Sequence, residues 1–158
     1  MPYNQKLAHS FTNRWKLRFW MASHLPMGML TGMRIHSIDE NGCVVVLKER
    51  WWIRNPFGSV FWAVMGMAAE LSTGALVYVY AVKGVKFILV GVEGTFFKKV
   101  KGKSYYFCQA GSEILRLTEH IQDAGDSGEV IMPVLVKDAG DQLLAEFSFR
   151  WQLRKPMI

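Results

Sequence analysis

One long apolar segment, residues 60–82, restricts the fold of this 158-residue chain more than any other feature. It reads VFWAVMGMAAELSTGALVYVYAV and contains a single ionisable side chain, Glu70. By length and apolarity the segment could cross a bilayer. However, a carboxylate near the centre of a span costs roughly 2.5 to 3.5 kcal/mol on insertion, and the residues that follow are patterned as a sheet, which a lone span does not need. We therefore expect no transmembrane span, and we interpret the segment as a core helix that is apolar all round because it is enclosed on every side.

A β-hairpin is predicted ahead of this helix. Residues 33–38 and 43–47 are patterned as strands, and an Asn-Gly pair in their connection is a strong turn signal. The second strand could continue through two tryptophans to Ile53. Residues 55–59 then predict a loop, because they combine Asn, Pro, Gly and Ser. Ser59 is a suitable N-cap for the long helix.

Further strand patterns follow the helix. Residues 86–99 are rich in Val, Phe and Ile and predict a strand, 104–110 predicts a second and 130–137 a third. Residues 113–124 fit one helical face but also fit a strand, so the sequence leaves their structure open. From residue 146 to residue 154 polar and apolar side chains alternate strictly, which indicates a half-buried antiparallel strand.

Residues 1–27 mix basic and aromatic side chains and predict a helical extension. Phe11, Trp15 and Phe19 recur at i, i+4 and i+8, so they share one face of a helix. We expect this face to pack on the body of the domain, and the alternative is a membrane-interfacial helix with a polybasic face. The segment lacks the apolar core of a secretory signal, so we expect a cytoplasmic protein.

The composition indicates a folded domain, since 51% of the residues are hydrophobic. At this length we expect one domain over residues 1–158. Cys43 and Cys108 lie in apolar runs, which predicts buried thiols in a reducing compartment. The net charge of +6 suits an anionic partner. The four scattered histidines show no metal-ligand spacing, and no nucleic-acid-binding motif is present, so we expect neither a metal nor a nucleic acid.

The order of hairpin, long helix and antiparallel strands predicts an α+β layer architecture, and an enclosed helix needs a sheet that curves around it. This arrangement resembles the hot-dog fold, in which a curved antiparallel sheet wraps one long central helix. The resemblance is sharpest in a motif of hot-dog thioesterases of the phenylacetate-degradation type. That motif is Asn-x-x-Gly-x-x-His-Gly-Gly, six residues and then Asp or Glu. The same spacing here reads Asn55, Gly58, Phe61-Trp62-Ala63 in place of His-Gly-Gly, and Glu70.

The resemblance implies an acyl-CoA thioesterase, a thioester hydrolase that acts on fatty or aromatic acyl-CoA. In the family the helix acid, here Glu70, is the nucleophile or the general base for water. The residues support this role independently, since desolvation raises the pKa of a carboxyl group in an apolar helix and improves it as a base near neutral pH. Asn55 holds the position of a polar loop residue that orients the carbonyl or the water, or it caps the turn. No cofactor is implied beyond coenzyme A as part of the substrate.

In the family a backbone N–H at the helix N-terminus stabilises the oxyanion, which suits the free amides and the dipole of that terminus. The amides of Trp62 and Ala63 occupy this position here, although the indole of Trp62 could also block the thioester. Some relatives carry a Thr four residues after the acid, where this chain has Gly74, with Thr73 beside it. The predicted oxyanion and pocket residues are Gly58, Ser59, Phe61, Trp62, Ala63 and Thr73.

Hot-dog sites form between two subunits, so the resemblance implies a homodimer, with a dimer of dimers as a further possibility. Glu70 would then face residues 55–63 of the partner. The phosphates of coenzyme A suggest basic contacts, for which the candidates are Lys98, Lys99, Lys101 and Lys103. The carrier of the acyl group is coenzyme A or an acyl carrier protein. The alternative function on the same scaffold is a non-catalytic acyl-CoA or fatty-acid binding protein.

Overall fold

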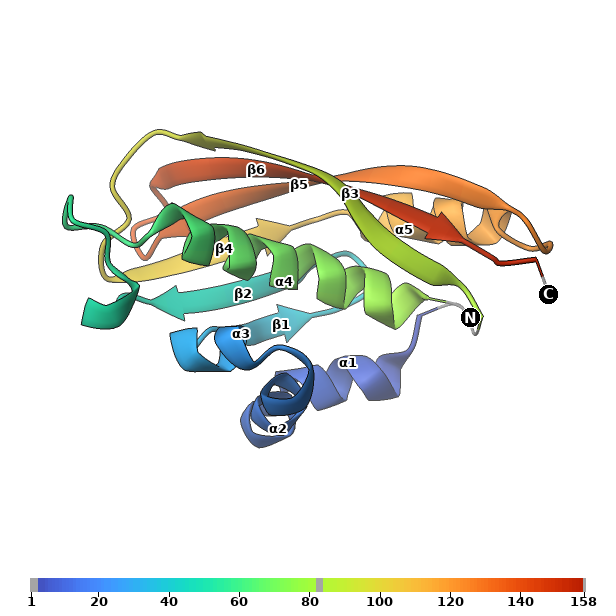
Figure 1. The fold of residues 1–158 in the computed structure, drawn as a ribbon, viewed down its shortest axis with the longest axis horizontal. Helices are drawn as coiled ribbons and strands as arrows, with labels where there is room; N and C mark the ends of the chain where they lie inside the picture. Colours follow the sequence, from blue (N-terminus) through green and yellow to red (C-terminus); the bar gives the residue numbers. More distant parts are fainter. Residues whose placement is uncertain (1–2, 82–83, 158) are drawn as a thin grey trace.

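The computed structural model describes residues 3–81 and 84–157 and shows a mixed α/β fold built around one curved sheet (Figure 1). In this part of the chain six antiparallel strands form the sheet in the order β1-β2-β4-β5-β6-β3. The strands are β1 Arg34–Ile38, β2 Cys43–Lys48, β3 Lys86–Phe96, β4 Lys103–Cys108, β5 Ser127–Asp138 and β6 Leu143–Arg154. The helices are α1 Gln5–Thr12, α2 Arg14–His24, α3 Pro26–Thr31, α4 Trp62–Tyr80 and α5 Gly111–His120, with a 3-10 helix η1 over Trp51–Ile53.

Helix α4 runs along the concave side of the sheet, as Figure 1 shows. Its side chains toward the sheet are completely buried, among them Ala68, Leu76 and Val79. By length and composition alone α4 could cross a membrane, but most of it is buried within the fold. This burial confirms the interpretation as a core helix, which explains why the segment is so apolar.

One side of α4 remains open in the single chain. Trp62, Glu70 and Tyr78, which recur two turns apart, are all exposed. The expectation that the helix is enclosed on every side is therefore wrong for one subunit, because the sheet covers only the other side. The last residue of the apolar segment, Val82, lies outside the described residues.

The start of α4 differs from the prediction that Ser59 is its N-cap. The helix begins at Trp62, and its N-cap residue Phe61 provides no side-chain hydrogen bond. The Ser59 side chain instead bonds to Asn55, where its Oγ accepts from Nδ2 at 3.0 Å. Ser59 therefore closes the preceding loop and leaves the first amides of α4 without a side-chain cap.

The strands follow the sequence pattern closely. The predicted N-terminal hairpin is β1 and β2, and the alternation from residue 146 to residue 154 is β6, which buries Phe149 and Leu153 against the core. Strand β2 ends at Lys48, so the tryptophans before Ile53 belong to η1 and not to a continued strand. The segment left open by the sequence forms helix α5.

The N-terminal helices do not use the face that the spacing predicted. Asn13 separates α1 from α2 and caps α2 by accepting from the amides of Trp15 and Lys16 at 3.1 Å. Because the chain changes direction there, Phe11 is buried, whereas Trp15 is 68% exposed and Phe19 is 74% exposed. The predicted packing of these two side chains on the domain is therefore wrong.

Three elements meet at the turn between β1 and β2. Tyr80, at the end of α4, donates its hydroxyl to the Glu40 carbonyl at 2.6 Å. The Gly111 amide, at the start of α5, donates to the Asn41 carbonyl at 2.9 Å. A Cβ at residue 111 would lie 1.9 Å from the Glu40 carbonyl oxygen, so only glycine permits this approach. The turn thereby fixes α5 against the end of the core helix.

The two cysteines lie opposite each other on β2 and β4 and are both free and completely buried. Burial raises the pKa of the Cys108 thiol to about 12 and raises that of Cys43 as well. Both side chains are therefore inert members of the core at neutral pH, as their apolar surroundings in the sequence predict.

Candidate active site

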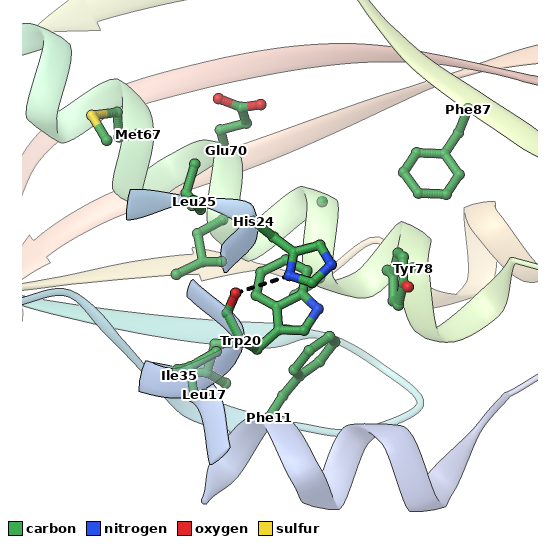
Figure 2. A pocket seen from close by; sticks show the side chains of 13 residues that line it. Phe11, Leu17, Trp20, His24, Leu25, Ile35, Met67, Glu70, Tyr78 and Phe87 are labelled. Atoms are coloured by element: carbon green, nitrogen blue, oxygen red, sulfur yellow. Dashed lines mark hydrogen bonds between the residues drawn. The ribbon is translucent and has the colours of Figure 1, made fainter. Parts of the chain in front are cut away.

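Glu70 occupies the middle of the open side of α4 (Figure 2). Its carboxylate has no hydrogen bond or ion pair to any residue that the structure describes. The apolar groups around it desolvate the charged form, which raises the pKa of Glu70 from its ordinary value. The main-chain carbonyl of Glu70, in contrast, accepts a hydrogen bond from the Thr73 hydroxyl at 3.0 Å. An unpaired carboxylate with a raised pKa is suited to accept a proton.

A cavity of about 320 Å³ opens beside this carboxylate. Its walls come from α1, α2, β1, the open side of α4 and β3. Figure 2 shows Glu70 and Met67 at one side of the cavity and Phe87 at another. Apart from Glu70, His24 and Tyr78, the lining is Phe11, Leu17, Trp20, Leu25, Ile35, Met67, Leu71, Gly74, Ala75 and Phe87. The cavity is therefore an apolar space with an acid at its wall, which is the usual composition of a site for a largely apolar ligand.

Two of the cavity residues, Trp20 and His24, were not expected from the sequence. Their rings stack at 4.9 Å between centroids, and the Trp20 carbonyl oxygen accepts from His24 Nδ1 at 3.0 Å. Their i, i+4 spacing was the available signal, since it places both on one side of a helix. The prediction concentrated on the other side of α2, which is exposed. The N-terminal extension thus supplies one wall of the cavity.

A second hollow, of about 330 Å³, lies at the N-terminus of α4. The predicted residues Asn55, Ser59, Trp62, Lys98 and Lys99 line it together. The first amides of a helix have no intrahelical partner, so this end of α4 offers free N–H donors. The loop, the helix start and the basic turn therefore meet at one hollow.

Asn55 organises the loop at this hollow. Its Oδ1 accepts from the amide of Phe57 at 3.0 Å and from the amide of Ser59 at 3.2 Å. Gly58 has a φ of 73°, a conformation in which glycine is strongly favoured. Of the two interpretations of Asn55, the structure shows the turn-capping one, with both polar atoms of its amide already bonded within the loop.

Phe61 and Trp62 cover the start of α4 with their rings 5.9 Å apart. Trp62 is 60% exposed and points away from the core, so it is not a core aromatic in the single chain. Ala63 follows on the same first turn and is partly buried. The backbone amides of Trp62 and Ala63 remain available despite the bulk of the indole.

The four lysines of the basic turn do not form one group. Lys98 and Lys99 border the hollow at the start of α4, and Lys99 Nζ donates to the Phe57 carbonyl at 2.9 Å. Lys101 is exposed in the turn. Lys103 lies at the start of β4 over the ring of Tyr105 and lines a different hollow. Of the four lysines, only Lys98 and Lys99 therefore border the hollow at the start of α4.

Thr73 lies outside both hollows. Its side chain is completely buried and accepts from the indole N–H of Trp151 at 3.0 Å. The hydroxyl is committed to the core on the sheet side of α4, while Glu70 lies on the open side. The spacing of three residues alone did not separate these two sides of the helix.

Glu70 and the free amides of the same chain are too far apart to act on one carbonyl group. Glu70 follows Trp62 by eight residues, a rise of about 12 Å along the helix. A reacting carbonyl must lie about 3 Å from both the base and the oxyanion donors. The single chain therefore contains two separate halves of a possible site. Among the described residues, no cluster of three His, Cys, Asp or Glu side chains is placed to bind a metal ion.

Comparison with solved structures assigns the fold. A protein of unknown function from Pseudomonas aeruginosa, described as a probable thioesterase, has a TM-score of 0.77 at 19% identity over 98% of this chain and 97% of its own. A thioesterase from Haemophilus influenzae has a TM-score of 0.68 at 12% identity over 90% and 91%. The PaaI protein of the E. coli phenylacetic acid degradation operon has a TM-score of 0.65 at 14% identity over 92% and 94%.

These similarities define the class: the chain has the hot-dog fold, with a six-stranded antiparallel sheet in its described part curved around one long helix. Residues 14–153 match the family described as a domain of unknown function, DUF4442, and the chain belongs to this family. No curated protein matches the sequence with significant similarity.

Proposed function

We propose that this protein hydrolyses acyl-CoA thioesters, with the carboxylate of Glu70 as general base or nucleophile. The observation that carries the proposal is the Glu70 carboxylate, which borders an apolar cavity, has a raised pKa and has no hydrogen-bond or ion-pair partner among the described residues. Desolvating a carboxylate without giving it a partner costs stability, and such costs are typical of functional sites. The thioesterases among the solved relatives share the fold and support the same reaction class.

The complete site is proposed to form between two subunits. Strand β3 pairs with β6 on one side and has no strand partner on its other side among the described residues. Ile88, Val90 and Val92 on this edge are exposed, and a long apolar edge strand is a ready surface for pairing with a second chain. A two-fold contact there would bring the open sides of two α4 helices together, so that Glu70 of each chain faces the α4 N-terminus of its partner. Two such dimers could pair further.

The proposed reaction divides its parts between the two chains. The thioester carbonyl oxygen lies at the amides of Trp62 and Ala63, which stabilise the oxyanion of the tetrahedral intermediate. As general base, Glu70 of the other chain takes a proton from water while the water oxygen attacks the carbonyl carbon. The C–S bond then breaks, and the thiolate leaves and receives the proton. As nucleophile, the same carboxylate would instead form an acyl-enzyme anhydride that water hydrolyses.

The cavity beside Glu70 is proposed to hold the acyl group. Its aromatic and aliphatic walls suit a fatty or aromatic acyl chain. Lys98 and Lys99 border the other half of the site and would contact the phosphates of the carrier, either coenzyme A or the arm of an acyl carrier protein. We place the protein in the cytoplasm, where such carriers occur and where its free cysteines remain reduced.

Release of free thiol from a panel of acyl-CoA substrates tests the proposal. Wild-type protein should release thiol with a preferred acyl chain length, and Glu70→Gln should lower the rate by about 10² to 10⁴. The amide is nearly isosteric with the acid and lies on the open side of α4, so the variant should remain folded. A Glu70→Gln variant that is as active as wild type would refute the role of this residue.

The second candidate is a non-catalytic acyl-CoA or fatty-acid binding protein. The exposed indole of Trp62, which stands where the resembled motif has glycine, favours it because the indole could block the carbonyl. This function predicts that palmitoyl-CoA or palmitate raises the melting temperature without release of thiol. No thermal shift with either ligand would exclude it.

A further inference from the structure

A basic hollow lies beside the N-terminal helices, and Leu17 is the one residue that it shares with the lining of the cavity at Glu70. Its volume is about 290 Å³, and it opens between α2, the end of α3 and the adjoining ends of β1, β2 and β4. Six cationic side chains line it: Arg14, Arg18, Arg34, Lys48, Arg50 and Lys103. No carboxylate lines the hollow, and none of the six forms an ion pair with a described residue. Six uncompensated cations around one hollow attract an anionic ligand.

Exposed apolar side chains border this hollow along α2. Trp15 follows Arg14 and Phe19 follows Arg18, so each aromatic ring lies one step around the helix from a cation of the hollow. The inner side of α2 is already satisfied, because Leu17 is buried in the core. Helix α2 therefore has two apolar sides, and the outer one is covered by nothing in the described chain.

A second set of exposed apolar groups borders the hollow at η1. The indole N–H of Trp52 donates to the Leu30 carbonyl at 3.2 Å, which ties η1 to α3. The Arg50 guanidinium lies 5.2 Å from the centre of the Trp52 ring. Both Trp52 and Leu30 are exposed. The hollow is thus flanked on two sides by aromatic and aliphatic groups, of which Trp52 is held in place by a hydrogen bond and by a cation–π contact.

We propose that this surface, which we call the basic–aromatic face, docks on an anionic phospholipid membrane, independently of the proposed hydrolysis. The face consists of the six cations of the hollow with Trp15, Phe19, Leu30 and Trp52. Aromatic rings beside arginine and lysine are the combination that inserts at a lipid headgroup layer, where the rings enter the acyl boundary and the cations meet phosphates. The hollow receives the headgroup phosphate, and the rings at its border enter the bilayer surface.

The charge and the aliphatic groups of the face argue against the other occupants. A second copy across a two-fold axis would set the six cations against the same six cations. A nucleic acid would also match the charge, but Leu30 offers no ring for base stacking. An anionic bilayer satisfies both the cations and the aliphatic groups of the face.

Vesicle sedimentation tests the proposal with full-length protein. Binding to phosphatidylglycerol-containing vesicles should exceed binding to phosphatidylcholine vesicles by at least about tenfold and should weaken as salt is raised. Trp15→Ser with Phe19→Ser should lower the partition coefficient by at least about tenfold. Arg14→Gln with Arg18→Gln should lower it by about 25-fold, since each cation near an anionic surface contributes roughly fivefold.

Matched controls distinguish binding through this face from nonspecific apolar adsorption and from an effect of net charge. Ile131→Ser removes an equally exposed apolar group from β5, and Arg116→Gln with Arg154→Gln removes two cations elsewhere, so both variants should bind like wild type. The proposal is overturned if the wild-type protein does not bind anionic vesicles, or if it binds neutral vesicles equally well. It is also overturned if the Trp15 and Phe19 variant binds as wild type does, or if that variant changes only the oligomeric state or only the affinity for single-stranded RNA.

Discussion

At the scale of single residues, Thr73 and Glu70 of the core helix have opposite roles. Thr73 is buried on the sheet side and satisfies the indole of Trp151, whereas Glu70 lies on the open side without a partner. Both are unusual in an apolar helix, and burial and the hydrogen-bond partner tell them apart. A satisfied polar group stabilises a core, and an unsatisfied acid lowers stability.

Glu70 should make the free energy of unfolding depend on pH, with a sign that follows from its raised pKa. Because burial raises the pKa of Glu70 above 4.5 in the folded protein, the folded state keeps this proton to a higher pH than the unfolded chain. The free energy of unfolding should therefore fall as pH rises from about 4.5 through the raised pKa. Glu70→Gln should remove this fall and should be at least as stable as wild type at pH 7. Urea unfolding of both proteins from pH 4 to pH 8 measures the difference, and identical pH profiles would contradict it.

Thr73 should respond in the opposite way. Thr73→Val keeps the shape of the side chain but leaves the buried indole N–H of Trp151 unpaired, which should lower the free energy of unfolding by about 1 to 3 kcal/mol. Thr73→Ser keeps the hydroxyl and serves as the control. Chemical denaturation should place the serine variant closer to wild type than the valine variant, and the reverse order would show that the hydrogen bond is unimportant.

At the scale of elements, local patterns predicted most of the sheet and the core helix. The Asn-Gly turn and the alternation before residue 154 give β1, β2 and β6 directly, because a strand with one buried face repeats every two residues. The N-terminal helices were predicted less well, since Asn13 interrupts the spacing that joins Phe11 to Trp15. A capping side chain changes the direction of the chain, and periodicity across it has no meaning.

The meeting of α5 with the β1–β2 turn depends on contacts distant in sequence. Gly111→Ala should lower the free energy of unfolding by about 2 kcal/mol or more, because its Cβ would collide with the backbone at Glu40. Gly66→Ala is the matched control, since open space surrounds that position in α4 and alanine favours a helix. Thermal melts should show a loss for the first variant and no loss for the second, and equal melting temperatures would contradict the packing.

At the scale of the whole molecule, the open side of α4 and the unpaired edge of β3 point to a second subunit. The sequence indicated the acid and the loop of the site but could not show that about 12 Å of helix separates Glu70 from the free amides. The i, i+4 spacing of Trp20 and His24 placed both on one side of a helix but could not show that this side lines the cavity. Both facts depend on how elements pack, which one-dimensional patterns do not encode.

Charged substitutions on β3 should separate the subunits. Ile88→Lys with Val92→Lys should convert a dimer into folded monomers, because lysines on an exposed edge prevent strand pairing. Ile131→Lys, on an exposed position of β5, should leave the mass unchanged. Sedimentation velocity measures the mass, and a wild-type protein that is monomeric at micromolar concentration would contradict the proposed dimer.

The shared site is tested most directly by complementation between two inactive variants. Glu70→Gln removes the base, and Trp62→Pro removes an amide donor at the first helical position, where proline fits because Phe61 is already extended. Trp62→Ala is the control, since it removes the indole but keeps the amide and should remain active.

When the Glu70→Gln and Trp62→Pro chains are co-expressed, half of the dimers should be mixed, and each mixed dimer should have one intact site. Thiol release from acyl-CoA should then return to about a quarter of the wild-type rate, as two-fold symmetry requires. A mixture that stays inactive, or a Glu70→Gln protein that is active alone, would contradict a site shared between Glu70 of one chain and the α4 N-terminus of the other.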